Sequence, residues 1–304
     1  MNYTEEVTLF ECAGDTLVGI LARPETPART GLVVIVGGPQ YRAGSHRQFV
    51  LLSRSLAAAG YAVLRFDYRG MGDSAGASRD FLAVNDDIAA AINALQQSIP
   101  VARQIVLLGL CDAASAALLY CYATQDPRVN GLCLLNPWVR SEASLARTQV
   151  KHYYTRRLVQ KSFWIKLLQG KMALSAWAGL FRNVHLMAAN QSRPTLPNQT
   201  FQQRMGTAWC NFSGTILLLL SDDDHTAWEF LEHGQRDAGW IAALAHPRLV
   251  RQNVQDANHT FSNVASRATV EKLTLDWLES QVSRCQEEEA ADVAPDLEPC
   301  ADAR

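Results

Sequence analysis

Short apolar runs alternate with longer amphipathic segments along most of the chain, and this pattern predicts its secondary structure. Near the N-terminus, two stretches at residues 7–11 and 16–22 flank Gly14-Asp15 and predict an antiparallel hairpin. Further strands are predicted at residues 33–36, 62–66, 104–108, 132–135, 215–220 and 247–253, and helices at 48–59, 84–97, 113–120, 227–234 and 264–280. This alternation predicts an α/β fold with a mostly parallel, eight-stranded sheet and helices on both faces.

Two segments break the alternation. Residues 141–211 are aromatic, basic and apolar without a clear strand, and they predict a helical lid inserted into a domain of residues 1–284. Residues 285–304 are rich in Glu, Ala, Asp and Pro and predict a disordered acidic tail. Within the lid, aromatic side chains would line a pocket and arginines would either meet an anionic group or face solvent. These residues are Tyr153, Tyr154, Trp164 and Trp177, and Arg147, Arg156 and Arg157.

Composition narrows the class of function. With 28 basic and 30 acidic residues the formal charge is −2, so no global field would recruit nucleic acid or an anionic membrane. The N-terminus has no visible secretory signal, and no apolar run is long enough for a membrane span, which predicts a cytoplasmic protein. The 7 scattered cysteines contain no C-x-x-C pair, so reduced thiols are expected, without a metal or other cofactor. A small-molecule substrate is the default partner, and the oligomeric state stays open.

The segment Gly109-Leu110-Cys111-Asp112-Ala113 follows an apolar strand and opens an Ala-rich helix. This is the context of a nucleophile elbow, in which small residues two places either side of the nucleophile avoid collision in a sharp turn. The helix N-terminus would favour a thiolate at Cys111. A buried structural cysteine is the alternative interpretation of this pentapeptide.

A second motif, Phe66-Asp67-Tyr68-Arg69-Gly70-Met71-Gly72-Asp73-Ser74, closes the preceding strand. Its D-x-R-G-x-G-x-S pattern resembles the loop after the fourth strand in many α/β-hydrolases. In that interpretation Asp67 and Arg69 pin a Gly-rich turn near the active site and take no direct part in catalysis.

The α/β-hydrolase fold presents nucleophile, acid and base in that order from loops after successive strands. His259, after the last predicted strand, is therefore the predicted base, which would take the Cys111 proton or hold the sulfur as a thiolate. Asp224, fourth after its strand, is the favoured acid, with Asp223 and Asp222 as alternatives.

An oxyanion hole needs two backbone N–H groups. The first is predicted at Asp112, directly after the nucleophile. The second is expected from the loop Gly37-Gly38-Pro39-Gln40; Pro39 has no N–H, so Gly38 and Gln40 remain open alternatives.

Four segments together carry a closer resemblance: residues 37–47, the D-Y-R-G-M-G-D-S loop, residues 109–114 and Asn136-Pro137-Trp138-Val139-Arg140. They resemble the exosortase A system-associated hydrolases of type 1, which belong with bacterial exopolysaccharide and protein-sorting loci. The predicted function is hydrolysis of an ester or thioester through a Cys111-His259-Asp224 triad. The alternatives are acyl transfer, lactone hydrolysis on the same site, or a catalytically silent binding protein.

Overall fold

The computed structural model of the chain describes residues 2–38, 40–140 and 199–293. The chain divides into two compact units, of which the larger comprises Met1–Trp138 and Phe201–Arg304 and the smaller Val139–Thr200. The predicted lid aromatics and arginines, from Arg147 to Trp177, lie outside the described residues.

The larger unit is built on an eight-stranded sheet with the order β1-β2-β4-β3-β5-β6-β7-β8. Strands β1 and β2 form the predicted hairpin and β2 pairs antiparallel with β4, while every later pairing is parallel. The strands are β1 (Tyr3–Cys12), β2 (Asp15–Pro24), β3 (Thr30–Ile35), β4 (Ala62–Phe66), β5 (Gln104–Leu110), β6 (Val129–Leu135), β7 (Thr215–Ser221) and β8 (Leu249–Val254). The predicted α/β-hydrolase sheet is therefore confirmed strand by strand.

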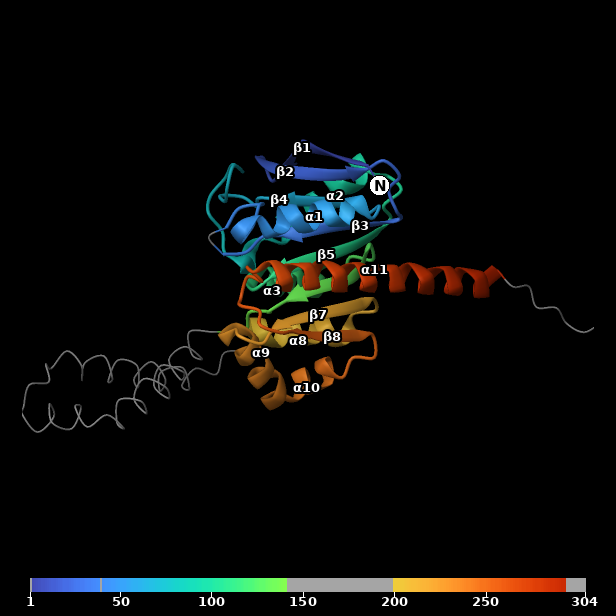
Figure 1. Ribbon diagram of the computed structural model, residues 1–304. Helices are drawn as coiled ribbons and strands as arrows, with labels where there is room; N and C mark the ends of the chain where they lie inside the picture. Colours follow the sequence, from blue (N-terminus) through green and yellow to red (C-terminus); the bar gives the residue numbers. More distant parts are fainter. Residues whose placement is uncertain (1, 39, 141–198, 294–304) are drawn as a thin grey trace, which may run out of the picture. The chain divides into compact units, whose positions relative to one another are not determined.

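Helices cover both faces of this sheet, as Figure 1 shows: α1 and α11 pack on one face, and α2, α3 and α8 lie on the other. The helices of the larger unit are α1 (Gln48–Ala58), α2 (Asn85–Ser98), α3 (Asp112–Thr124), α8 (Phe201–Asn211), α9 (His225–Arg236), α10 (Ala238–Leu244) and α11 (Val264–Val293). Two short 3₁₀ turns, η1 (Ser45–Arg47) and η2 (Phe81–Ala83), complete the described elements.

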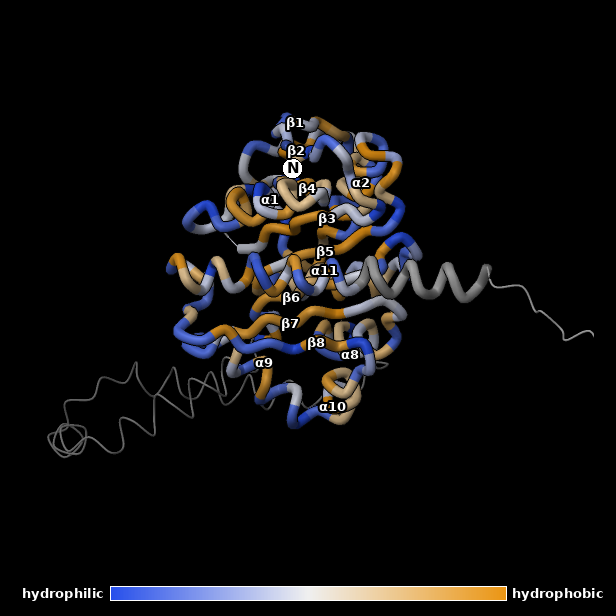
Figure 2. Tube along the Cα trace, turned by 45° about the vertical axis from the view of Figure 1, so that its right-hand side comes forward, coloured by the Kyte–Doolittle hydropathy of each residue, from blue (hydrophilic) through white to orange (hydrophobic). Residues whose placement is uncertain are grey.

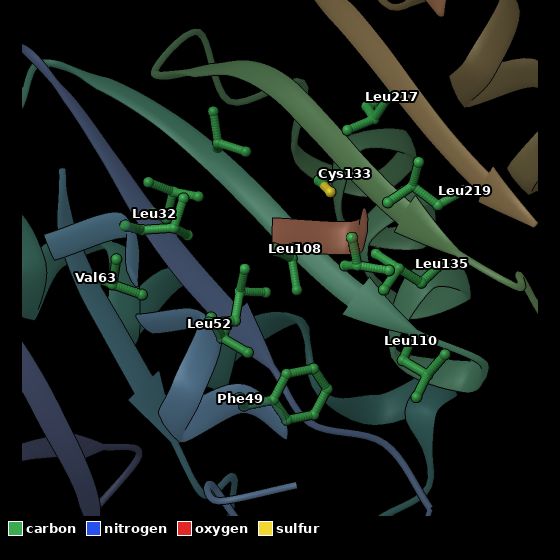
Figure 3. Packing of buried hydrophobic residues seen from close by; sticks show 14 of the residues in the cluster. Leu32, Phe49, Leu52, Val63, Leu108, Leu110, Cys133, Leu135, Leu217 and Leu219 are labelled. Atoms are coloured by element: carbon green, nitrogen blue, oxygen red, sulfur yellow. The ribbon is translucent and has the colours of Figure 1, made fainter. Parts of the chain in front are cut away.

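The central strands are buried along their whole length, which explains why they are continuous apolar runs. In Figure 2 these strands form an apolar band through the middle of the unit. Figure 3 shows the cluster on the α1 side, where Phe49 and Leu52 of α1 meet residues of the central strands. Burial of these side chains is the main force that fixes the carboxyl ends of β5, β6 and β7 beside one another.

Three helical segments differ from the prediction. Residues 201–211, predicted as part of the lid, form α8, which packs against α3 and α10 because Trp209 is buried in a ring cluster with Phe230 and Trp240. Helix α10 was not predicted; Asp237 caps it by accepting hydrogen bonds from the N–H groups of Gly239 and Trp240. Helix α11 continues to Val293, so residues 285–293 are helical where a disordered tail was predicted.

Candidate active site

Cys111 lies in a strained turn between the end of β5 and the start of α3. Its backbone has φ 62° and ψ −123°, a conformation that costs free energy for any residue with a side chain. Backbone hydrogen bonds hold it there: the Cys111 N–H donates to Leu135 O at 2.9 Å, and the Trp138 N–H donates to Cys111 O at 3.2 Å. A Cβ at Gly109 would lie 2.5 Å from the Ala113 carbonyl carbon, so this position requires glycine. The elbow geometry predicted from the small residues is present.

His259 and Asp224 meet beside this turn. The Nδ1 atom of His259 lies 2.8 Å from Asp224 Oδ2, and His259 and Cys111 line the same cavity. Asp224 also caps α9 by accepting from the N–H groups of Thr226 and Ala227. The structure thus brings together the three residues selected from the sequence.

The electrostatics of this group of residues favour a charged imidazole. The pKa of His259 is raised to about 10, first by its hydrogen bond to Asp224 and second by the neighbouring Cys111 side chain. Burial alone would raise the pKa of Asp224, but the hydrogen bonds from His259 and from two backbone N–H groups lower it. At neutral pH the arrangement therefore holds an imidazolium between a carboxylate and the sulfur.

The other two candidate acids have different positions. Asp222 accepts hydrogen bonds from the N–H groups of Asp256 and Ala257, at 3.0 and 3.1 Å, and so ties down the loop that carries His259. Asp223 has an exposed side chain, and its backbone N–H donates to Ala257 O. Asp224 is the aspartate that contacts the imidazole.

A buried polar network behind His259 was missed in the sequence. The Asn136 side-chain amide donates to Ser221 Oγ at 2.8 Å and to the backbone carbonyl of His259 at 3.0 Å, and its oxygen accepts from the Ser221 N–H at 2.8 Å. Ser221 Oγ donates in turn to Asn258 O. Asn136 has φ 43°, which asparagine tolerates better than most residues. The available signal was a polar Asn-Pro step directly after a buried strand.

Asn136→Ala is expected to lower kcat of the enzyme by about 10- to 100-fold with little change in KM, because the His259 loop loses its support and the imidazole shifts from its working position. Steady-state kinetics with an ester substrate check this split. Asn130→Ala is the matched control, since Asn130 is exposed at the opposite end of the same strand. Equal losses in kcat and in the folded fraction would show that Asn136 serves stability alone.

The loop after β3 faces Cys111 and is anchored by a buried carboxylate. Asp67, which is fully buried, accepts hydrogen bonds from the Arg42 backbone N–H at 2.6 Å, the Arg42 guanidinium, and the Asp73 N–H at 3.0 Å. This is the pinning role predicted for Asp67. Gly38 donates its N–H to Asp112 Oδ2 at 2.9 Å, and the Gln40 side chain accepts from the Ser45 N–H.

Gly38, Gln40, Cys111, Asp112 and His259 border a cavity of about 430 Å³, whose wall combines polar groups with aromatic and aliphatic side chains. Its lining residues are Gly37, Gly38, Gln40, Phe49, Phe81, Leu110, Cys111, Asp112, Trp138 and His259. A larger hollow of about 790 Å³ lies near the start of β6 and the ends of α3 and α8. It is at the opposite end of the sheet from the predicted catalytic residues, so we do not assign it to the reaction.

The described ranges contain no group of three or more His, Cys, Asp or Glu side chains that could hold a metal ion. Among the same residues, no helix has the length and apolar character that crossing a bilayer requires.

Comparison with known proteins agrees with this architecture. Residues 32–272 match the "Alpha/beta hydrolase family", and the chain belongs to that family. A comparison with curated proteins finds no match.

Solved structures share the fold at low identity. An esterase of Pyrococcus furiosus, Pf2001, is 14% identical with a TM-score of 0.62, covering 92% of both chains. Est1E from Butyrivibrio proteoclasticus, solved with ferulic acid, is 14% identical with a TM-score of 0.56, covering 89% of this chain and 99% of its own. DcsB, solved with a substrate analogue, is 13% identical with a TM-score of 0.58, covering 91% of this chain and 100% of its own.

Proposed function

We propose that the protein hydrolyses an ester or thioester through an acyl-enzyme on Cys111. The observation that carries this proposal is the position of Cys111 beside the hydrogen-bonded pair of His259 and Asp224, with Cys111 and His259 lining one partly apolar cavity. Asp224 fixes the ring orientation of His259, and the raised pKa of His259 supports a protonated imidazole that can act as the acid toward the leaving group.

In the acylation step the Cys111 thiolate adds to the substrate carbonyl carbon, and the carbonyl electron pair moves onto the oxygen. Backbone N–H groups, with Asp112 as the first donor and the Gly38–Gln40 loop as the source of the second, stabilise the resulting oxyanion. The intermediate collapses, the bond to the leaving group breaks, and the leaving alkoxide or thiolate takes the proton of the His259 imidazolium. A thioester to Cys111 remains.

In the second half the neutral imidazole of His259 removes a proton from water as the oxygen adds to the thioester carbonyl. Collapse of this second intermediate breaks the C–S bond, releases the acid and restores the thiolate–imidazolium pair. Asp224 stays ionised throughout, which agrees with its lowered pKa.

The proposal includes the type 1 exosortase A-associated subtype. Three of the segments that carry the resemblance supply walls of the cavity: Gly37 and Gly38, Cys111 and Asp112, and Trp138. A reducing compartment keeps a thiol nucleophile unoxidised, and the cytoplasm is the proposed location.

Cys111→Ala is expected to abolish acylation and to lower kcat by about 10⁴-fold or more, since the variant has no nucleophile. The butyryl thioester of N-acetylcysteamine serves as probe, with mass spectrometry locating the acyl group. Cys210→Ala is the matched control, because Cys210 is an exposed free thiol on α8 and should leave acylation unchanged. Undiminished turnover by Cys111→Ala would refute the proposal.

A further inference from the structure

The side chain of Asp112 hydrogen-bonds to the loop that faces Cys111. Its carboxylate accepts the Gly38 N–H at 2.9 Å, and the backbone N–H groups of Gly38, Ala113 and Asp112 itself act to lower its pKa. The proposed mechanism assigns the Asp112 N–H, and an N–H of the loop that contains Gly38, to the oxyanion. In this structure an oxygen anion of the protein therefore holds a loop N–H that is a candidate donor to the acyl oxygen.

The Asp112 carboxylate packs closely against the backbone of Gly37 and Gly38. A Cβ at Gly37 would lie 1.8 Å from Asp112 Oδ1, so the absence of a side chain at Gly37 is what admits the carboxylate. Asp112 Oδ1 itself is buried and has no hydrogen-bond partner among the described residues. One oxygen is thus held by the loop while the other is buried without compensation, an arrangement that costs free energy.

The surroundings of the Asp112 carboxyl make its ionised form less favourable. Burial raises the pKa of Asp112, against the opposing effect of the backbone N–H groups and of His259. The titratable side chains facing it are Cys111 from the elbow, His259 from the loop after β8, and Tyr68 from the loop after β4. Only the His259 imidazolium among these can offset the charge of Asp112.

We propose that the Asp112 carboxylate is an internal occupant of the oxyanion hole, which the acyl oxygen must displace, and that Asp112 thereby selects for uncharged acyl groups. This inference rests on the proposed function. Two anionic oxygens cannot share the same donors, because like charges repel at this distance. Once displaced, the carboxylate remains within the cavity, whose aromatic wall offers little compensation, so it disfavours an anionic acyl chain.

The proposal sets the direction of a pH effect. Above its raised pKa Asp112 is ionised and holds the Gly38 N–H by a charge-assisted bond. Below that pKa the neutral carboxyl is a weaker acceptor and yields more readily to the substrate. The obstruction by Asp112 should therefore grow as the pH rises.

The test compares the wild-type enzyme with Asp112→Asn and Asp112→Ala. Acylation of Cys111 by the butyryl thioester of N-acetylcysteamine is timed by quenched-flow mass spectrometry between pH 5 and 9. Alkylation by iodoacetamide is measured in parallel, because displacement at a saturated carbon develops no oxyanion and reports the reactivity of the thiolate alone. The ratio of acylation to alkylation isolates the oxyanion hole.

At pH 8 both variants should raise this ratio by about 10-fold or more over the wild type, since one oxyanion donor is typically worth about 100-fold or more in rate. For Asp112→Asn the advantage should shrink as the pH falls toward the raised pKa of Asp112. The gain should be larger for the succinyl than for the butyryl thioester. A ratio that is unchanged or lowered in both variants, an advantage independent of pH, or equal gains for the two acyl chains would overturn the inference.

Failure of the proposed function gives a different result. If neither the wild type nor the variants acquire an acyl group on Cys111 while iodoacetamide still modifies it, the acyl-enzyme itself is refuted. Circular dichroism of each variant verifies that α3 is intact, and the pH dependence of the wild-type ratio tests the inference without any substitution.

Discussion

Asp224→Asn is expected to lower kcat/KM for thioester hydrolysis by about 10⁴-fold, with the fold intact. The amide would offer an N–H to His259 Nδ1 or hold the ring in the wrong tautomer. The substitution would also remove the negative charge that stabilises the imidazolium. Asparagine remains a good N-cap, so α9 should still begin at the same residue. The loss should therefore be one of catalysis and not of stability.

The pH profile supplies an independent measurement. Leaving-group protonation requires the imidazolium, which the wild type retains until the pH approaches the His259 pKa of about 10. Because the Asp224 hydrogen bond is the larger cause of that shift, the alkaline limit of kcat/KM should move in Asp224→Asn toward the ordinary value of 6.5. Asp223→Asn, at an exposed neighbour, should change neither the rate nor the limit. A loss below 10-fold in Asp224→Asn would contradict the assignment.

The sequence predicted the sheet well because its strands are of two easily distinguished kinds. Strands buried on both faces, such as β3 and β7, are apolar along most of their length. Short apolar runs bounded by turn residues are typical of such strands. The edge hairpin shows the alternation of a half-exposed strand. Cys111, His259 and Asp224 were selected from the predicted sheet, since each lies in the segment that follows a strand whose carboxyl end reaches the same edge.

The missed elements depend on contacts that local sequence does not encode. Helix α8 contains Gly206 and several polar residues, and it is stabilised by a tryptophan cluster whose members come from three helices. The support of His259 by Asn136 joins residues 123 positions apart in the chain. The bond between Gly38 and Asp112 likewise spans 74 positions, so the sequence assigned a role to the Asp112 backbone but not to its side chain.

Arg69→Met is expected to destabilise the fold by about 3–5 kcal/mol, because it leaves a buried charge without its partner. The Arg69 Nε and Nη2 atoms donate to the two oxygens of Asp87 at 3.0 and 2.8 Å, and its backbone N–H donates to Asp87 Oδ1 at 2.8 Å. The Asp87 side chain is 0% exposed and that of Arg69 is 3% exposed. The variant would keep only the backbone donor for a carboxylate that water cannot reach.

Denaturant unfolding of the wild type and variants measures this loss. Arg236→Met is the matched control: its partner Glu232 and Arg236 are 51% and 68% exposed, so removing that ion pair should cost less than about 1 kcal/mol. The double variant Arg69→Met/Asp87→Leu should recover much of the stability, since it removes the orphaned charge along with its partner. If Arg69→Met unfolds at the same denaturant concentration as Arg236→Met, the Arg69–Asp87 pair does not anchor the Gly-rich loop, and the prediction is wrong.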